Sequence, residues 1–235
     1  MLRVLFGERP REWAGAELET VRAIESFVRQ AYETAERRPA EAKTYRTYAI
    51  AAEGLLRSMD ELEQSVYAAK RYALFVPHKR VDELTERERL DYDRHVYYDK
   101  NAYIRVFALL DKLATLLNPL LGLRTERIKS RYSYYTMLRN MRENDLHPGL
   151  SKPLNALKVD HQGAMNRLRH RRNLEIHQMN AELRDDLQQS LADKPHRMLE
   201  NLKASMADLE QGWEMCRESL HASFRYANGI MRRIR

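Results

Sequence analysis

The stretch YIRVFALLDKLATLL, residues 103–117, decides the fold class of this chain. Apolar side chains fill two neighbouring helical faces of it. One face carries Tyr103, Phe107, Leu110, Ala114 and Leu117, and the next carries Val106, Leu109, Leu113 and Leu116. A helix that is apolar over most of its circumference lies inside a bundle rather than on its surface. We expect this central helix to begin near Thr85, which can cap it, and to close at Pro119 and Gly122.

The apolar residues on both sides of this helix also recur at helical spacing. The pattern predicts helices over about 15–37, from about 45 to before Pro77, over about 124–144, over roughly 158–188, and from Pro195 onwards. The clearest break between them is the polar segment 144–153.

Turn residues are scarce, with only 8 Gly and 7 Pro among 235 residues, about half the usual share. That scarcity excludes sandwiches, barrels and doubly wound sheets, which need frequent turns or loops. The sequence therefore predicts an all-α bundle of five to six helices. We expect residues 1–80 to form a long N-terminal helical hairpin packed on a bundle of residues 81–235, together as one compact unit.

The last predicted helix carries a heptad stripe, a row of mainly apolar residues spaced alternately by three and four. The stripe consists of Leu199, Leu202, Met206, Leu209, Trp213, Cys216 and Leu220. Such a row packs against a neighbour in the bundle or against a second chain. Cys216 is the single cysteine, which excludes an intrachain disulfide and a Cys-rich zinc site and favours a buried, inert thiol.

Two further segment types are missing from the sequence. The N-terminal residues 1–9 have no apolar stretch typical of a signal peptide, and no window approaches 18 uncharged apolar residues. We therefore expect a cytoplasmic protein without a membrane span.

The positive charge of the chain is concentrated in one window. The net charge is +7, but residues 124–172 contain 12 Lys or Arg and 4 Asp or Glu, a net charge of +8, and the remainder sums to −1. Localised positive charge attracts polyanions such as nucleic acids. The alternative is a solvated helix face with no ligand. Tyr132, Tyr134 and Tyr135 lie within this window, either to stack on bases or to pack in the core.

Standard catalytic spacings are missing from the sequence. There is no Gly-rich phosphate loop, no Gly-x-Ser-x-Gly and no His-Glu-x-x-His, and no two of the eight histidines are four residues apart. One pattern inside the basic window remains, RHRRNLEIH over residues 169–177. Five Arg/His pairs in the chain have four to six residues between them, but only Arg172, paired with His177, is followed by Asn, Asp or His.

This Arg172-Asn173-x-x-x-His177 pattern, here called the Arg–Asn–His motif, resembles the signature of the HEPN superfamily. That signature is an Arg, four to six residues and a His, with Asn, Asp or His directly after the Arg. The resemblance covers roughly residues 95–225, including the aromatic-to-aliphatic central helix. HEPN proteins are all-helical; many are metal-independent ribonucleases, and others are binding modules without catalysis.

The resemblance implies a metal-independent endoribonuclease that needs no cofactor. RNA supplies its own nucleophile, the 2′-hydroxyl, so the enzyme must transfer protons and stabilise charge on the phosphate. Arg172 would hold the phosphate, His177 would transfer protons and Asn173 would orient either group. Asn173 and His177 share a helix face, whereas Arg172 is offset from His177 by about 140°.

The resemblance also implies partners. HEPN nucleases pair two motifs across a dimer, so we expect a homodimer, with RNA as substrate and an inhibitory or antitoxin protein as a candidate regulator in a toxin–antitoxin or defence-like role. The residues that we expect to bind RNA are Arg124, Arg127, Lys129, Arg131, Arg167, Arg169, His170 and Arg171.

Two alternatives stay open at this point. The chain could be a non-catalytic HEPN-type module that binds nucleic acid, nucleotide or a partner protein. It could also be a helical scaffold that associates through the heptad stripe. The binding module would use the same basic face but would not need His177. The plain structural alternative is that His177 is a hydrogen-bonded histidine at a helix surface and that Arg172 is a solvated charge.

Overall fold

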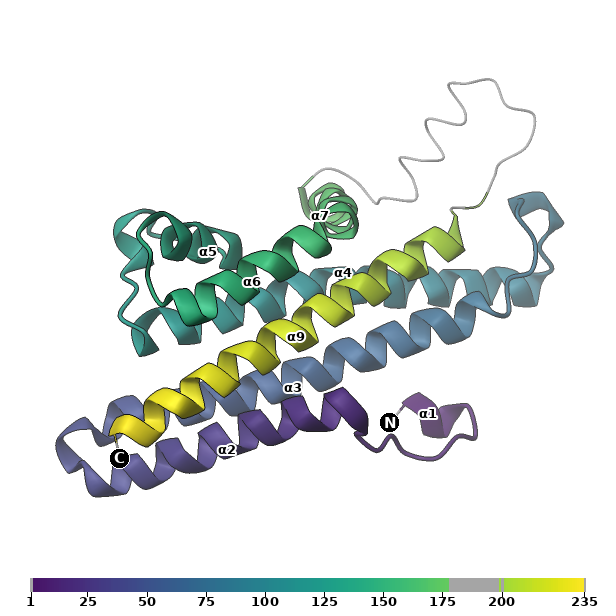
Figure 1. Cartoon of the computed structure of the whole chain (residues 1–235). Helices are drawn as coiled ribbons and strands as arrows, with labels where there is room; N and C mark the ends of the chain where they lie inside the picture. Colours follow the sequence, from purple (N-terminus) through teal and green to yellow (C-terminus); the bar gives the residue numbers. More distant parts are fainter. Residues whose placement is uncertain (1, 178–198, 200, 235) are drawn as a thin grey trace. The chain divides into compact units, whose positions relative to one another are not determined.

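The computed structural model of the chain describes residues 2–177, 199 and 201–234, which form eight α-helices and no β-strand (Figure 1). The helices are α1 (Leu2–Leu5), α2 (Gly15–Arg37), α3 (Ala42–Ala73), α4 (Glu86–Leu120), α5 (Tyr134–Glu143), α6 (Pro148–Asp160), α7 (Gln162–His177) and α9 (Leu202–Ile234). Short 3₁₀ turns are η1 (Pro39–Glu41), η2 (Val81–Glu83) and η3 (Thr125–Arg127). The predicted all-α class is confirmed. No described helix is long and apolar enough to cross a membrane.

The chain divides into two compact units that interleave along the sequence. Unit 1 comprises residues 1–60, 108–160 and 214–235, and unit 2 comprises residues 61–107 and 161–213. The three longest helices, α3, α4 and α9, contribute residues to both units. A hairpin of residues 1–80 packed on a separate bundle stays a prediction.

The core of unit 1 joins α2, α5 and the C-terminal half of α9. Phe27 and Phe224 are both buried and meet edge to face with ring centroids 5.3 Å apart. Beside them the Gln30 amide of α2 donates to Oδ1 of Asn228 of α9 at 2.7 Å, so a buried hydrogen bond joins the two helices. Tyr134 of α5 is fully buried, and its hydroxyl lies 3.0 Å from that of Ser219.

The central helix α4 begins directly after Thr85, the residue that the sequence predicts as its cap. The hydroxyl of Thr85 accepts from the Glu88 backbone N–H at 3.3 Å, and the Thr85 N–H donates to the Glu88 carboxylate at 2.8 Å. This reciprocal capping box satisfies two N–H groups that have no partner within the helix. The predicted start of α4 next to Thr85 is therefore confirmed.

Two of the later predicted helix boundaries are wrong, and local caps explain both. The helix expected from 124 begins only at Tyr134, because Ser133 and Thr136 form a capping box there and Arg124 has a left-handed φ of 53°. The expected break over 144–153 is shorter, because α6 already begins at Pro148. Proline fits the first helical position, where no N–H donor is needed.

The last helix also begins later than expected. Asn201 caps it, since its side-chain oxygen accepts from the Ala204 N–H at 3.1 Å, and Leu199 lies outside the helix. Within the heptad stripe Leu209, Cys216 and Leu220 are fully buried. Burial raises the pKa of the Cys216 thiol, in agreement with an inert side chain. The predicted helix end over 178–188 and the predicted start at Pro195 lie outside the described residues.

A glycine sets the spacing of three helices in unit 2. A Cβ on Gly212 of α9 would lie 2.9 Å from a Leu168 methyl of α7 and 3.2 Å from a Val106 methyl of α4. Such distances force neighbouring side chains to move, so close packing of α7 depends on this glycine.

Gly212→Ala should therefore lower the free energy of unfolding by about 1–3 kcal/mol, although alanine is the better helix former. Gly229→Ala is the matched control in the same helix, because a Cβ on Gly229 would have nothing within 4 Å of it. The control should gain about 0.5–1 kcal/mol. Urea unfolding of both variants measures the difference, and equal stability of the two would contradict the close approach.

Candidate functional site

The Arg–Asn–His motif occupies the last two turns of α7, within unit 2. Four buried apolar side chains hold this helix in its unit: Ala164, Met165, Leu168 and Leu174. The apolar face therefore fixes which motif residues face the protein and which face solvent.

A row of ion pairs at every fourth residue fastens α7 to its neighbours. Arg167 binds Asp208 of α9 with two hydrogen bonds of 2.7 and 2.8 Å, and these bonds raise the pKa of Arg167. One turn further on, Arg171 pairs with Asp99 of α4. Another turn on, Glu175 lies 3.1 Å from Nζ of Lys100. These pairs orient α7 about its own axis.

The Arg171 pair is the most buried of the three. The Asp99 side chain is 2% exposed and that of Arg171 is 19% exposed. Asp99 also accepts from the Ser205 hydroxyl at 3.2 Å, and the Arg171 guanidinium lies 5.0 Å from the Tyr103 ring centroid. Arg171 is thus already engaged by protein groups, which supports an anchoring role; its contact with RNA stays a prediction.

A buried histidine lies on α4, one turn before Asp99. Nδ1 of His95 donates to the Ala69 carbonyl oxygen at 2.9 Å, and its Nε2 is buried without a hydrogen-bond partner among the residues described. Burial lowers the pKa of His95 and outweighs the carboxylate of Asp99. His95 is therefore neutral and serves the packing of unit 2.

Arg172 has a different environment from Arg167 and Arg171. Its guanidinium carbon lies 5.0 Å from the Phe107 ring centroid, and its Nε is buried without a hydrogen-bond partner in the described part of the chain. The described residues include no carboxylate paired with it. As far as residues 2–177, 199 and 201–234 go, the Arg172 charge and its Nε–H donor are left for an anionic ligand to satisfy.

The solvent-facing side of the motif carries three polar side chains. His170, Asn173 and His177 are all exposed. They follow one another at spacings of three and four, so they share one face of α7. Arg172 lies about 140° around the helix from His177, half-buried at Phe107. The structure thus groups His170 with Asn173 and His177, and it does not bring Arg172 onto their face.

The position of His170 on this face could be predicted from the sequence. His170 precedes His177 by seven residues, which is two helical turns, so the two side chains lie on the same face. Arg169, by contrast, is half-buried, with its guanidinium carbon 5.9 Å from the Phe107 centroid.

The remaining predicted RNA-binding residues, Arg124, Arg127, Lys129 and Arg131, are exposed and lie around η3 in unit 1. The basic window is therefore shared between the two units. Its part in unit 1 has 8 basic and 4 acidic residues, and its part in unit 2 has 4 basic residues and none that are acidic. Each unit thus receives a net charge of +4 from the window.

The tyrosines of the window have separate environments. Tyr134 is 0% exposed, so it packs in the core and cannot stack on a base. Tyr132 and Tyr135 are half-buried, and the Tyr135 hydroxyl lies 3.8 Å from the Met215 sulfur. Tyr134 belongs to the buried face of α5, which also carries Met137, Leu138 and Met141.

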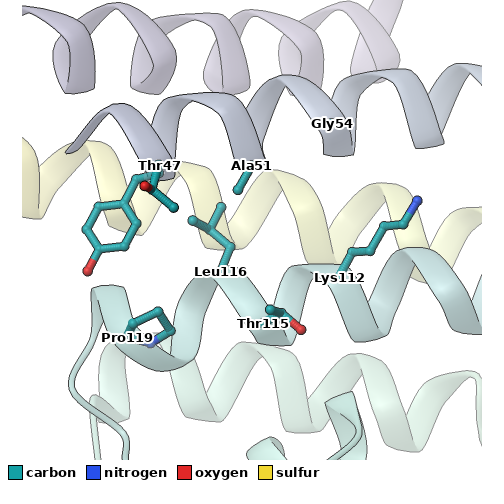
Figure 2. Close-up of a pocket in the computed structure, with 8 residues that line it drawn as sticks. Thr47, Ala51, Gly54, Lys112, Thr115, Leu116 and Pro119 are labelled. Atoms are coloured by element: carbon teal, nitrogen blue, oxygen red, sulfur yellow. The ribbon is translucent and has the colours of Figure 1, made fainter. Parts of the chain in front are cut away.

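Unit 1 contains an open cavity of about 340 Å³ between α3 and α4 (Figure 2). Its lining is mostly small and apolar, and Lys112 at its edge donates to the Ser58 hydroxyl at 2.8 Å. None of the predicted site residues lines it. Among residues 2–177, 199 and 201–234, no group of three or more His, Cys, Asp or Glu side chains is placed to hold a metal ion.

Comparison with protein families gives one match. A family model described as Cthe2314-like HEPN matches residues 52–228, about three quarters of the chain. The matched segment includes the central helix α4 and the whole Arg–Asn–His motif. Comparisons with curated proteins and with solved structures gave no match.

Proposed function

The chain belongs to the HEPN superfamily, and we propose that it is a metal-independent endoribonuclease that acts on RNA as a homodimer. The observation that carries this proposal is the Arg–Asn–His motif on a firmly held helix. Asn173 and His177 are open to solvent, and Arg172 has no carboxylate partner among the described residues.

The proposed reaction uses only groups of the RNA and of the protein. A base removes the proton of the 2′-hydroxyl, whose oxygen then bonds to the adjacent phosphorus. The bond from phosphorus to the 5′-oxygen breaks, and an acid gives that oxygen a proton. The products are a 2′,3′-cyclic phosphate and a 5′-hydroxyl.

His177 suits both proton transfers, because an imidazole can lose or gain a proton near neutral pH. Arg172 would stabilise the charge that grows on the phosphate oxygens, and Asn173 would orient the imidazole or the phosphate through its amide. One chain supplies one such motif. Two copies would supply two His177 side chains, one as base and one as acid.

This mechanism predicts that the full-length protein cuts RNA in the presence of EDTA and leaves DNA of the same sequence intact. DNA lacks the 2′-hydroxyl that acts as the nucleophile. Gel analysis of an end-labelled RNA and its DNA counterpart measures both reactions. Cleavage of the DNA, or loss of RNA cleavage in EDTA, would contradict the proposal.

A second candidate is a HEPN-type module that binds RNA without cutting it. The observation that favours it is the position of Arg172 beside Phe107, away from the face of His177. In that case the wild-type protein and His177→Ala would bind RNA equally and neither would cleave it.

A further inference from the structure

A second basic site lies in unit 1, where no residue of the Arg–Asn–His motif is found. It is a cavity of about 290 Å³ at α5, α6 and the segment that precedes α5. Its lining consists of Lys129, Tyr135, Thr136, Arg139, Arg142 and Lys158. Four of these six side chains carry a positive charge, and none carries a negative one.

Little within unit 1 neutralises that charge. Arg142 pairs with the adjacent Glu143 at 3.7 Å, but both side chains are more than half exposed, so the pair is weak. Lys129, Arg139 and Lys158 form no ion pair with any carboxylate in the described ranges. Like charges that share a cavity repel one another, and an anion bound between them would relieve the repulsion.

The folding of α5 and α6 explains why these cations gather. Tyr135, Arg139 and Arg142 follow one another at spacings of four and three, so they lie on one face of α5. Lys158 lies in the last turn of α6, which packs against α5. Lys129 lies two residues after η3, and η3 also contacts α5.

The N-terminal end of α5 is not itself the anion site. The Tyr134 N–H donates to Asp111 at 2.8 Å, and the Thr136 N–H donates to the Ser133 hydroxyl at 3.3 Å. Because the protein already uses these donors, the cationic side chains must provide the binding.

We propose that this cavity binds a backbone phosphate of RNA and forms a docking site in addition to the motif. Guanidinium groups bind phosphate oxygens in pairs, and the half-buried Tyr135 beside them offers an aromatic surface to a base. The volume is at the small end for a ligand site, which suits one nucleotide rather than a large cofactor. Exposed Arg127 and Arg131 continue the positive charge beyond the cavity, which favours a polyanion over a single free phosphate. Only the identity of the polyanion as RNA rests on the proposed function.

Fluorescence anisotropy with a single-stranded, fully 2′-O-methylated RNA tests this site, because such RNA cannot be cleaved. The double variant Arg139→Glu/Lys158→Glu should raise Kd at least about tenfold. Each phosphate contact on a single strand contributes about 0.7 to the slope of log K against log salt, so loss of two contacts should reduce the slope by about 1.4.

Matched charge reversals provide the control. Lys152 lies on the same helix as Lys158 but outside the cavity, and Arg22 on α2 also lies outside it. The double variant Arg22→Glu/Lys152→Glu therefore changes the net charge by the same amount as Arg139→Glu/Lys158→Glu without altering the cavity. The control should bind nearly as tightly as the wild type. Equal Kd values and equal salt slopes for the two double variants would overturn the proposal, provided that both melt at the wild-type temperature.

Two further measurements distinguish RNA from a small phosphorylated ligand, and distinguish the docking proposal from the nuclease proposal. If Arg139→Glu/Lys158→Glu loses binding of tripolyphosphate but keeps full affinity for RNA, the cavity serves a small phosphorylated ligand and docking of RNA is wrong. If the wild type cuts no RNA while its binding depends on Arg139 and Lys158, the nuclease proposal fails and the docking site is supported.

Discussion

Replacing His177 with alanine should lower the rate of RNA cleavage by at least about 100-fold, because a positioned acid or base contributes roughly 10²–10⁴ to such a reaction. The side chain is exposed at the end of the described part of α7. Its removal therefore leaves the packing of unit 2 intact, and the melting temperature should not change. Single-turnover cleavage of a labelled RNA measures the rate without interference from product release.

His170→Ala is the matched control for this variant. It removes the same side chain from the same exposed face of α7, two helical turns away. We expect its effect to stay below about tenfold and to fall mainly on RNA binding, since it removes one phosphate donor at most. Cleavage by His177→Ala at the wild-type rate, or an equal loss in both variants, would show that His177 has no special chemical role.

Replacing Asp99 with alanine should lower the free energy of unfolding by about 3–5 kcal/mol, the usual cost of removing one partner from a buried ion pair. Asp99 is 2% exposed and holds both Arg171 and Ser205. Without the carboxylate, the Arg171 guanidinium stays largely enclosed and loses its counter-charge. Urea unfolding followed by circular dichroism measures the loss.

Asp93→Ala tests whether the effect belongs to this ion pair. Asp93 lies on the same helix but is exposed, so its removal should change stability by no more than about 0.5 kcal/mol. A loss below about 1 kcal/mol for Asp99→Ala would mean that Asp99 does not anchor α7, and the orientation of the motif would need another cause.

The fold class could be predicted from the sequence because helical periodicity is a local property. The stretch 103–117 is apolar on adjacent faces, and its helix is capped at Thr85 as expected. Boundaries that depend on a single cap were harder to predict. The cap at Ser133 delays one helix by about ten residues, and the cap at Asn201 leaves Leu199 outside another. Nothing in the periodicity marks either cap.

The candidate site could be predicted only in part, because spacing along one helix cannot reveal contacts with another. The spacing places Asn173 and His177 on one face, and both are exposed there. The spacing could not indicate that Arg171 pairs with Asp99, which lies 72 residues earlier in the chain. Nor could it indicate that Arg172 forms no ion pair with a carboxylate of the described residues. The basic cavity was missed for the same reason, since Lys158 reaches it from a different helix from Arg139.

The chemistry at the cut ends tests the central claim most directly. The wild-type protein is incubated with RNA in EDTA, and the fragments are weighed by mass spectrometry. The account predicts 2′,3′-cyclic phosphate and 5′-hydroxyl ends from the wild type and intact RNA from His177→Ala. Fragments with 3′-hydroxyl and 5′-phosphate ends, or cyclic phosphate ends that His177→Ala forms equally fast, would contradict it.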